Sequence, residues 1–142
     1  MARILALDFG QVRIGVAISD PERRMAFGRP TLQRRNDADD LRRLRELVQA
    51  EEDIERIVVG YPRTLSGKAG PAAESVERFV ARLRGTFPAL TVETWDERMT
   101  TAQSKRMLIG AGMRREKRRK VVDESAAMLI LQSWLDARRG EN

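Results

Sequence analysis

Residues 3–19 have the sequence RILALDFGQVRIGVAIS, and this segment decides the fold. Residues 3–8 are almost continuously apolar until Asp8, which predicts a buried strand that ends in an acid. Residues 13–19 alternate between large aliphatic and small residues, which predicts a second strand with room for close packing on one face. Gly10 and Gln11 occupy the short gap between the strands and indicate a hairpin.

The rest of the chain alternates between predicted helices and strands. A third strand is expected at residues 25–30, with Pro30 favouring a sheet edge. Residues 36–51 predict a helix capped by Asp37, with an apolar stripe at Leu41, Leu44, Leu47 and Val48. Strands are expected at residues 56–60 and 90–94, a turn at residues 67–70, and helices from Pro71 and over residues 100–109 and 122–138. The order predicts one α/β domain over residues 1–142, with a mixed five-stranded sheet, an antiparallel hairpin edge and helices on both faces.

Composition excludes several kinds of catalytic site. The chain of 142 residues has no cysteine and no histidine, which rules out thiolate sites, histidine triads and histidine-based zinc centres. Its 27 Lys and Arg residues against 21 Asp and Glu give a net charge of +6, which favours polyanionic partners such as nucleic acid. No apolar run approaches the roughly 20 residues needed to cross a bilayer, so we expect a soluble cytoplasmic protein that is independent of membranes.

Acidic residues and a glycine mark the ends of three predicted strands. Asp8 closes the first strand, Gly60 stands at the end of the fourth, and Asp96 and Glu97 follow the fifth. If these strands are parallel neighbours, the three points lie at one sheet edge, where open α/β sheets place their ligands. Gly60 would let a substrate backbone approach there. Asp123, near the start of the last predicted helix, can be brought over the same edge.

Three carboxylates suit a pair of Mg²⁺ or Mn²⁺ ions whose coordination is completed by phosphate oxygens and water. Two such ions about 4 Å apart activate the attacking water and stabilise the leaving oxygen during phosphodiester hydrolysis. Asp8 would bridge both ions, and Glu97 and Asp123 would bind one each. Each acid also has a structural alternative: Asp8 as a turn residue, Glu97 as a solvated acid, and Asp123 as a helix cap.

The densest charge is RREKRRK at residues 114–120, just before Asp123. A solvated loop is the alternative, but this position favours a cationic arm that contacts phosphates at the rim of the acidic site. Aromatic residues make up only 5% of the chain, so contacts to backbone and shape are expected rather than base stacking. The candidate nucleic-acid contacts are Arg13, Lys68, Arg98, Arg114, Arg115, Lys117, Arg118, Arg119 and Lys120. For Arg13, Lys68 and Arg98 the alternative is an ordinary surface cation.

Four segments together resemble the YqgF/RuvX family of Holliday junction resolvases, which are also proposed as pre-16S ribosomal RNA nucleases. They are ALDFG and RIGVAISD within residues 6–20, VVGYPR at residues 58–63 with Gly67 and Gly70-Pro71, DERMTT at residues 96–101, and DESAA at residues 123–127 with ILQ at residues 130–132. The resemblance covers nearly the whole chain. It implies a ribonuclease H-like fold and a three-carboxylate metal site, carried onto Asp8, Glu97 and Asp123.

Two residues depart from the family pattern. Gln11 stands where the family often has a small hydroxyl residue, and Tyr61 stands where it often has leucine. The first departure bears on a phosphate contact, and neither affects the acidic residues.

Several functional alternatives stay open at the level of sequence. A junction resolvase cuts two strands symmetrically and is expected to be a homodimer, whereas an enzyme that trims ribosomal RNA can be a monomer. A non-catalytic RNA-binding module of ribosome assembly would keep the same fold and the basic arm. An ATPase of the actin and sugar-kinase type also has Asp-x-Gly after a strand, but it needs two domains and a phosphate-gripping hydroxyl where this chain has Gln11.

Overall fold

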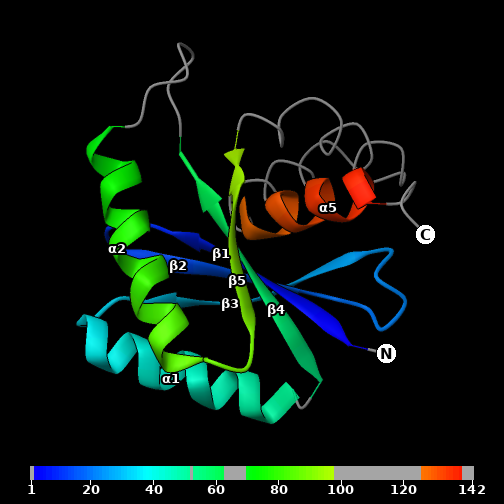
Figure 1. Ribbon diagram of the computed structural model, residues 1–142, viewed down its shortest axis with the longest axis horizontal. Coiled ribbons are helices and arrows are strands. Elements are labelled where there is room, and N and C mark those ends of the chain that lie inside the picture. Colours follow the sequence, from blue (N-terminus) through cyan, green and yellow to red (C-terminus); the bar gives the residue numbers. More distant parts are fainter. Residues whose placement is uncertain (1, 52, 63–69, 98–125, 139–142) are drawn as a thin grey trace.

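The computed structural model describes residues 2–51, 53–62, 70–97 and 126–138, and a mixed sheet runs through this part of the chain (Figure 1). Its strands are β1 (Arg3–Phe9), β2 (Arg13–Ser19), β3 (Ala26–Gln33), β4 (Ile54–Tyr61) and β5 (Thr91–Asp96). They lie in the order β3-β2-β1-β4-β5. The pairs β1–β2 and β2–β3 are antiparallel, and the pairs β1–β4 and β4–β5 are parallel. The predicted hairpin edge on a parallel centre is therefore confirmed.

The first hairpin closes through a tight turn at residues 10–12. The Gly10 N–H donates to the Arg13 carbonyl oxygen at 3.0 Å. A Cβ at position 10 would lie 2.9 Å from that same oxygen, which explains the glycine. The turn therefore keeps the ends of β1 and β2 side by side at the carboxyl edge of the parallel strands.

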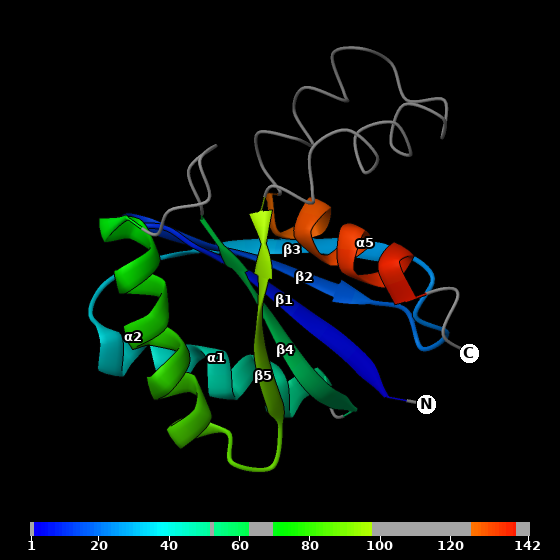
Figure 2. The same ribbon diagram turned by 45° about the horizontal axis from the view of Figure 1, so that its top comes forward.

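Helices cover both faces of the sheet, as the sequence predicts (Figure 2). On one face lie α1 (Asp37–Glu51) and α2 (Pro71–Thr86), and on the other lies α5 (Ala126–Arg138). The core beneath α1 and α2 contains Leu5, Leu7, Ile14, Ile57, Leu44 and Leu83 among other residues. The core beneath α5 contains Ile4, Ala6, Ala17, Val58, Ile130 and Trp134 among other residues. Because successive strand residues alternate between these cores, β1 and β4 are covered on both sides.

Several predicted boundaries change. The strand predicted at residues 56–60 extends over Ile54–Tyr61, and the strand predicted at residues 90–94 occupies Thr91–Asp96. The cap of α1 is Asn36, whose Oδ1 accepts the Asp39 N–H at 2.8 Å, so the prediction of Asp37 as the cap is wrong. Asp37 is the first helical residue, and its carboxylate accepts from Arg34 at 2.7 Å. The edge strand β3 is confirmed, but it continues past Pro30 to Gln33.

Several predicted elements lie outside the described residues. These are the turn at residues 67–69, the helix over residues 100–109 and the beginning of the last helix before Ala126. Within the described part of the chain, the helices are too short or too polar to cross a membrane.

Candidate active site

Asp8 lies at the end of β1 on the face covered by α5. Ala6, two residues earlier, packs in the core beneath α5, and strand alternation places Asp8 on the same face. Its partner across the hairpin is Gly15. A Cβ at position 15 would lie 3.4 Å from the Asp8 Cβ and 3.5 Å from the Ala127 Cβ of α5. The predicted close packing on the small-residue face of β2 is thus the approach of α5 to the strand beside Asp8.

Glu97 follows β5 directly and is half-buried. It reaches inward across Gly60 of the neighbouring strand β4. A Cβ at position 60 would lie 2.8 Å from the Glu97 Oε1 and 2.5 Å from the Ile130 Cδ1. The expectation that Gly60 admits a substrate backbone is therefore wrong, because Glu97 and Ile130 fill that space.

The two carboxyl groups meet. The side chains of Asp8 and Glu97 lie within hydrogen-bonding reach of each other, an arrangement that favours a proton on one of the two carboxyl groups. Burial raises the pKa of Asp8, although the hydrogen bond from Glu97 opposes this shift. The pKa of Glu97 is raised to about 7, mainly by burial. The charge of Asp8, a hydrogen bond with Asp8 and the charge of Asp96 add to this shift. The parallel neighbours β1, β4 and β5 thus bring together two of the three predicted acids.

This pair fits a divalent cation. Carboxylate oxygens are the ligands that Mg²⁺ and Mn²⁺ prefer, and the described site offers no nitrogen or sulfur ligand that would favour zinc or copper. Two half-buried carboxylates at this distance repel each other strongly when both are ionised. A hard cation would take the place of that proton and relieve the repulsion between Asp8 and Glu97.

The third predicted acid, Asp123, lies outside the described residues. Among the residues that the structure does describe, no group of three acidic, histidine or cysteine side chains is close enough to hold a metal ion. Ala126, the first described residue of α5, lies three positions after Asp123 in the sequence and lines the same pocket as Asp8.

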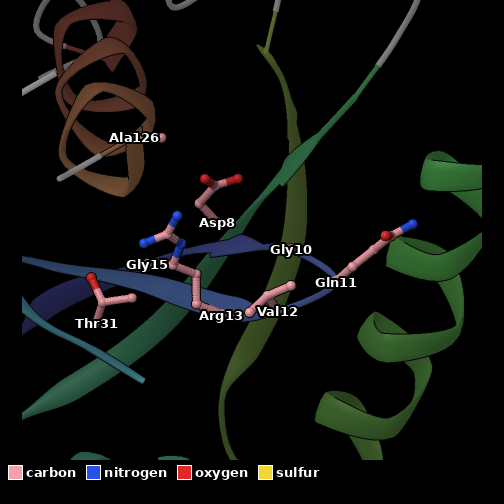
Figure 3. A pocket seen from close by; sticks show the side chains of 8 residues that line it. All are labelled: Asp8, Gly10, Gln11, Val12, Arg13, Gly15, Thr31 and Ala126. Atoms are coloured by element: carbon pink, nitrogen blue, oxygen red, sulfur yellow. The ribbon is translucent and has the colours of Figure 1, made fainter. Parts of the chain in front are cut away.

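A pocket of about 470 Å³ opens beside Asp8 (Figure 3). It is lined by Asp8, Gly10, Gln11, Val12, Arg13, Gly15, Thr31 and Ala126. Arg13 is exposed, and its side chain makes no hydrogen bond or ion pair within the described part of the chain, unlike most arginines there. The pocket therefore combines a carboxylate with a guanidinium group that is available to an anionic ligand.

The other predicted nucleic-acid contacts lie outside the described residues. They are Lys68, Arg98, Arg114, Arg115, Lys117, Arg118, Arg119 and Lys120. They remain predictions.

Arg34 supports the turn that forms one wall of the pocket. Its backbone N–H donates to the Val12 carbonyl at 2.8 Å, and its Nη1 donates to the Gly10 carbonyl at 3.3 Å. Its guanidinium carbon lies 4.3 Å from the centre of the Phe9 ring. Its Nε donates to Asp40 Oδ2 at 3.2 Å. These contacts connect α1 to the pocket through one side chain.

Asp40 is a completely buried acid that holds this support in place. Burial alone would raise its pKa. The backbone N–H of Arg35 and the guanidinium groups of Arg43 and Arg34 outweigh burial and hold the pKa below its usual range. Asp40 is thus a charged residue that stabilises the structure by binding Arg34, and it is not one of the acids of the pocket.

Sequence reasoning missed one polar residue of the pocket, Thr31. The residue lies on β3, far along the chain from Asp8, and no motif marks it. Pro30 in a predicted strand was the available signal, because proline within a strand accompanies edges and bulges.

Comparison with known proteins is consistent with this geometry. Residues 2–137 match the model of the family described as "RuvX: Holliday junction resolvase". A relative from Geobacillus kaustophilus is 46% identical over 139 residues, covering 96% of this chain and 99% of the relative. A relative from Moorella thermoacetica is 46% identical over 140 residues, covering 99% and 98%. Both carry the name "Putative pre-16S rRNA nuclease".

Solved structures of RuvC have the same fold. Thermus thermophilus RuvC in complex with a Holliday junction substrate superposes with a TM-score of 0.66 at 15% identity, covering 99% of this chain and 97% of that one. A second RuvC structure from the same organism gives a TM-score of 0.56, also at 15% identity, covering 97% and 96%. The expected ribonuclease H-like fold is therefore confirmed.

Proposed function

Since this chain belongs to the RuvX family of Holliday junction resolvases, we propose that it is a nuclease that hydrolyses phosphodiester bonds in structured nucleic acid. The observation that carries the proposal is the close pair of Asp8 and Glu97, which the parallel neighbours β1, β4 and β5 bring together at their carboxyl ends. Such a pair destabilises the fold, because both carboxyl groups lose solvation and repel each other when ionised. A cation bound between them would offset both costs and so explains the pair.

Asp8 and Glu97 would hold the divalent ions, and we include Asp123 as the third ligand from the sequence. Bound Mg²⁺ or Mn²⁺ supplies an activated water and neutralises charge on the phosphate under attack. The chain's own part is to hold the two carboxylates on rigid strand ends, so that no reorganisation is needed when substrate arrives. Arg13 would hold a phosphate oxygen beside them, because its guanidinium group is available on the pocket wall.

We assign precursor 16S ribosomal RNA as the first candidate substrate, because relatives at 43–46% identity are named "Putative pre-16S rRNA nuclease". The family's description favours a second candidate, the four-way DNA junction. A junction substrate requires two sites related by a two-fold axis, and the RNA substrate does not. Oligomeric state therefore separates the two candidates, and either substrate would be met in the cytoplasm.

The decisive experiment uses the pure full-length protein with Mg²⁺ or Mn²⁺. Labelled RNA spanning the precursor's 5′ end and a labelled four-way junction are incubated separately, with Asp8→Asn as the control for contaminating nuclease. Asn preserves the shape of Asp8 but removes the charge that binds metal. We expect cleavage of one substrate by the wild type, none by the variant, and unchanged or tighter binding by the variant.

Three other outcomes would change the assignment of the function or of Asp8. Tight binding with no cleavage of either substrate under both metals would identify a non-catalytic RNA-binding module. Saturable ATP turnover by the pure protein would revive the ATPase alternative. Loss of folding in Asp8→Asn, seen by thermal unfolding, would make Asp8 a structural residue.

A further inference from the structure

The edge strand β3 is irregular directly beside the pocket. Its register against β2 shifts between Ile14 and Val16, so that Pro30 and Thr31 together face the single residue Gly15. Two residues opposite one is a β-bulge, a feature that re-aims side chains and is over-represented next to active sites.

The bulge changes the face on which Thr31 lies. Ala26 packs beneath α5, so regular alternation would place the even-numbered residues of β3 on that face and Thr31 on the opposite face. Leu32 instead packs against the core beneath α1 and α2, and Thr31 lines the pocket with Asp8. The extra residue therefore delivers the Thr31 side chain to the active-site face.

The delivered hydroxyl has chemistry that suits a phosphate. Thr31 is half-buried, and its hydroxyl makes no hydrogen bond within the described part of the chain. Arg13 and Asp8 line the same pocket from β2 and β1, the next two strands of the sheet (Figure 3). Gly15 lies between Asp8 and the bulge and adds no side chain there. Hydroxyl and guanidinium groups are common hydrogen-bond donors to the phosphate oxygens of nucleic acids.

We propose that Thr31 contacts the substrate and, with Arg13, binds a phosphodiester adjacent to the one that is cut. This inference rests on the proposed nuclease function. The hydroxyl donates to a non-bridging phosphate oxygen and Arg13 neutralises its charge, while Asp8 and Glu97 act on the neighbouring linkage. The nucleic-acid strand then runs from the acidic pair across β2 towards the edge strand β3.

The test compares Thr31→Val with Thr31→Ser in the full-length protein. Valine keeps the β-branched shape but removes the hydroxyl, and serine keeps the hydroxyl. Binding to the labelled RNA and to the four-way junction is measured in an Asp8→Asn background with Mg²⁺, where no cleavage interferes. For whichever nucleic acid binds, we expect Thr31→Val to weaken affinity roughly tenfold and Thr31→Ser to stay within about twofold.

Salt dependence separates a substrate contact from a structural effect. Thr31 carries no charge, so Thr31→Val should leave the slope of log affinity against log salt unchanged, whereas Arg13→Gln should reduce it by about 0.7–0.9. If both residues grip one phosphate, the losses in the double variant should be less than additive. In the active protein, Thr31→Val should raise KM more than it lowers kcat.

The inference and the proposed function fail separately. Wild-type affinity in a folded Thr31→Val protein would overturn the phosphate subsite, even if Asp8→Asn still abolishes cleavage. If instead the wild type cleaves nothing, the nuclease function fails, and the binding measurements still decide whether Thr31 contacts nucleic acid. Should Thr31→Val lower the melting temperature, Thr31→Ala with unaltered stability takes its place, and equal loss in Thr31→Ser would refute a role for the hydroxyl.

Discussion

Gly60 offers the sharpest test of how the acidic pair is built. The substitution Gly60→Ala adds a Cβ that would lie 2.5 Å from the Ile130 Cδ1 and 2.8 Å from the Glu97 Oε1. Both distances are well below van der Waals contact, so Ile130, Glu97 or the strand must move. Ile130 is only 2% exposed in the core beneath α5, which leaves its end methyl little room.

The cost can be worked from these contacts. Overpacking of this kind lowers the free energy of unfolding by about 1–3 kcal/mol. Replacing glycine by alanine on an unstrained backbone raises it by about 0.4–1 kcal/mol, because alanine reduces the conformational entropy of the unfolded chain. We expect a net loss of about 1–2 kcal/mol, or a fall in Tm of about 2–8 °C for a chain of this length. Displacing Glu97 by even 1 Å should lower kcat by up to about a hundredfold.

A second variant separates stability from catalysis. Ile130→Val removes the Cδ1 methyl and by itself costs about 0.5–1.5 kcal/mol. In the double variant the clash with Ile130 is gone but the clash with Glu97 persists. Urea unfolding should therefore show a smaller loss than the sum of the two single variants, while cleavage stays depressed.

Two results would refute this reasoning. Wild-type stability and cleavage in Gly60→Ala would mean that the space above Gly60 is not filled. Recovery of cleavage together with stability in the double variant would mean that the activity loss came from the core, and that Gly60 does not position Glu97.

Three further predictions concern charge and anchoring. The pKa of Glu97, about 7 against its ordinary 4.5, means that the folded protein keeps a proton that the unfolded chain has lost, so metal-free stability should fall as pH rises from 4.5 to 7. Tm measured in EDTA across this window should show a weaker fall in Glu97→Gln, and identical curves would contradict the shift. Asp40 has a lowered pKa, so the stability it contributes is present above about pH 4 and is lost as pH falls through the folded pKa. Asp40→Asn should cost about 2–3 kcal/mol at pH 7 in urea unfolding and less at pH 3, and equal losses at both values would contradict this account. Gln132 accepts the Ala26 N–H at 3.0 Å and so ties α5 to the start of β3. Gln132→Leu should cost about 1–3 kcal/mol in thermal unfolding by leaving that donor unpaired, and an unchanged Tm would show that water replaces the amide.

Local pattern was enough to predict most of the sheet and its acids. Residues 13–19 form β2 as predicted, because alternation of large and small side chains depends only on neighbours along the chain. Asp8 and Glu97 lie at the ends of predicted strands. An acid at the end of a buried strand is costly without a partner, and the parallel order of β1, β4 and β5 brings the strand ends to one edge.

The boundary of α1 shows a limit of local pattern. Asn36 and Asp37 are adjacent and are equally good caps by residue type. In the structure Asn36 caps the helix, while the Asp37 carboxylate binds Arg34 and Arg82 at 2.7 and 3.2 Å. The contact from Arg82 comes from α2, far along the chain, so the sequence around the cap does not contain it.

Gly60 and Thr31 were beyond prediction for a physical reason that they share. A glycine at the end of a strand indicates that something approaches closely, but it does not say whether that is a ligand or another part of the chain. At Gly60 the answer depends on Glu97 and Ile130, and at Thr31 it depends on a slip of one residue against β2. Register between strands is set by the whole sheet, and a slip of one residue moves a side chain to the other face. The acids of this site follow from the ends of strands, whereas the residues that shape the space around them follow only from how those strands pair.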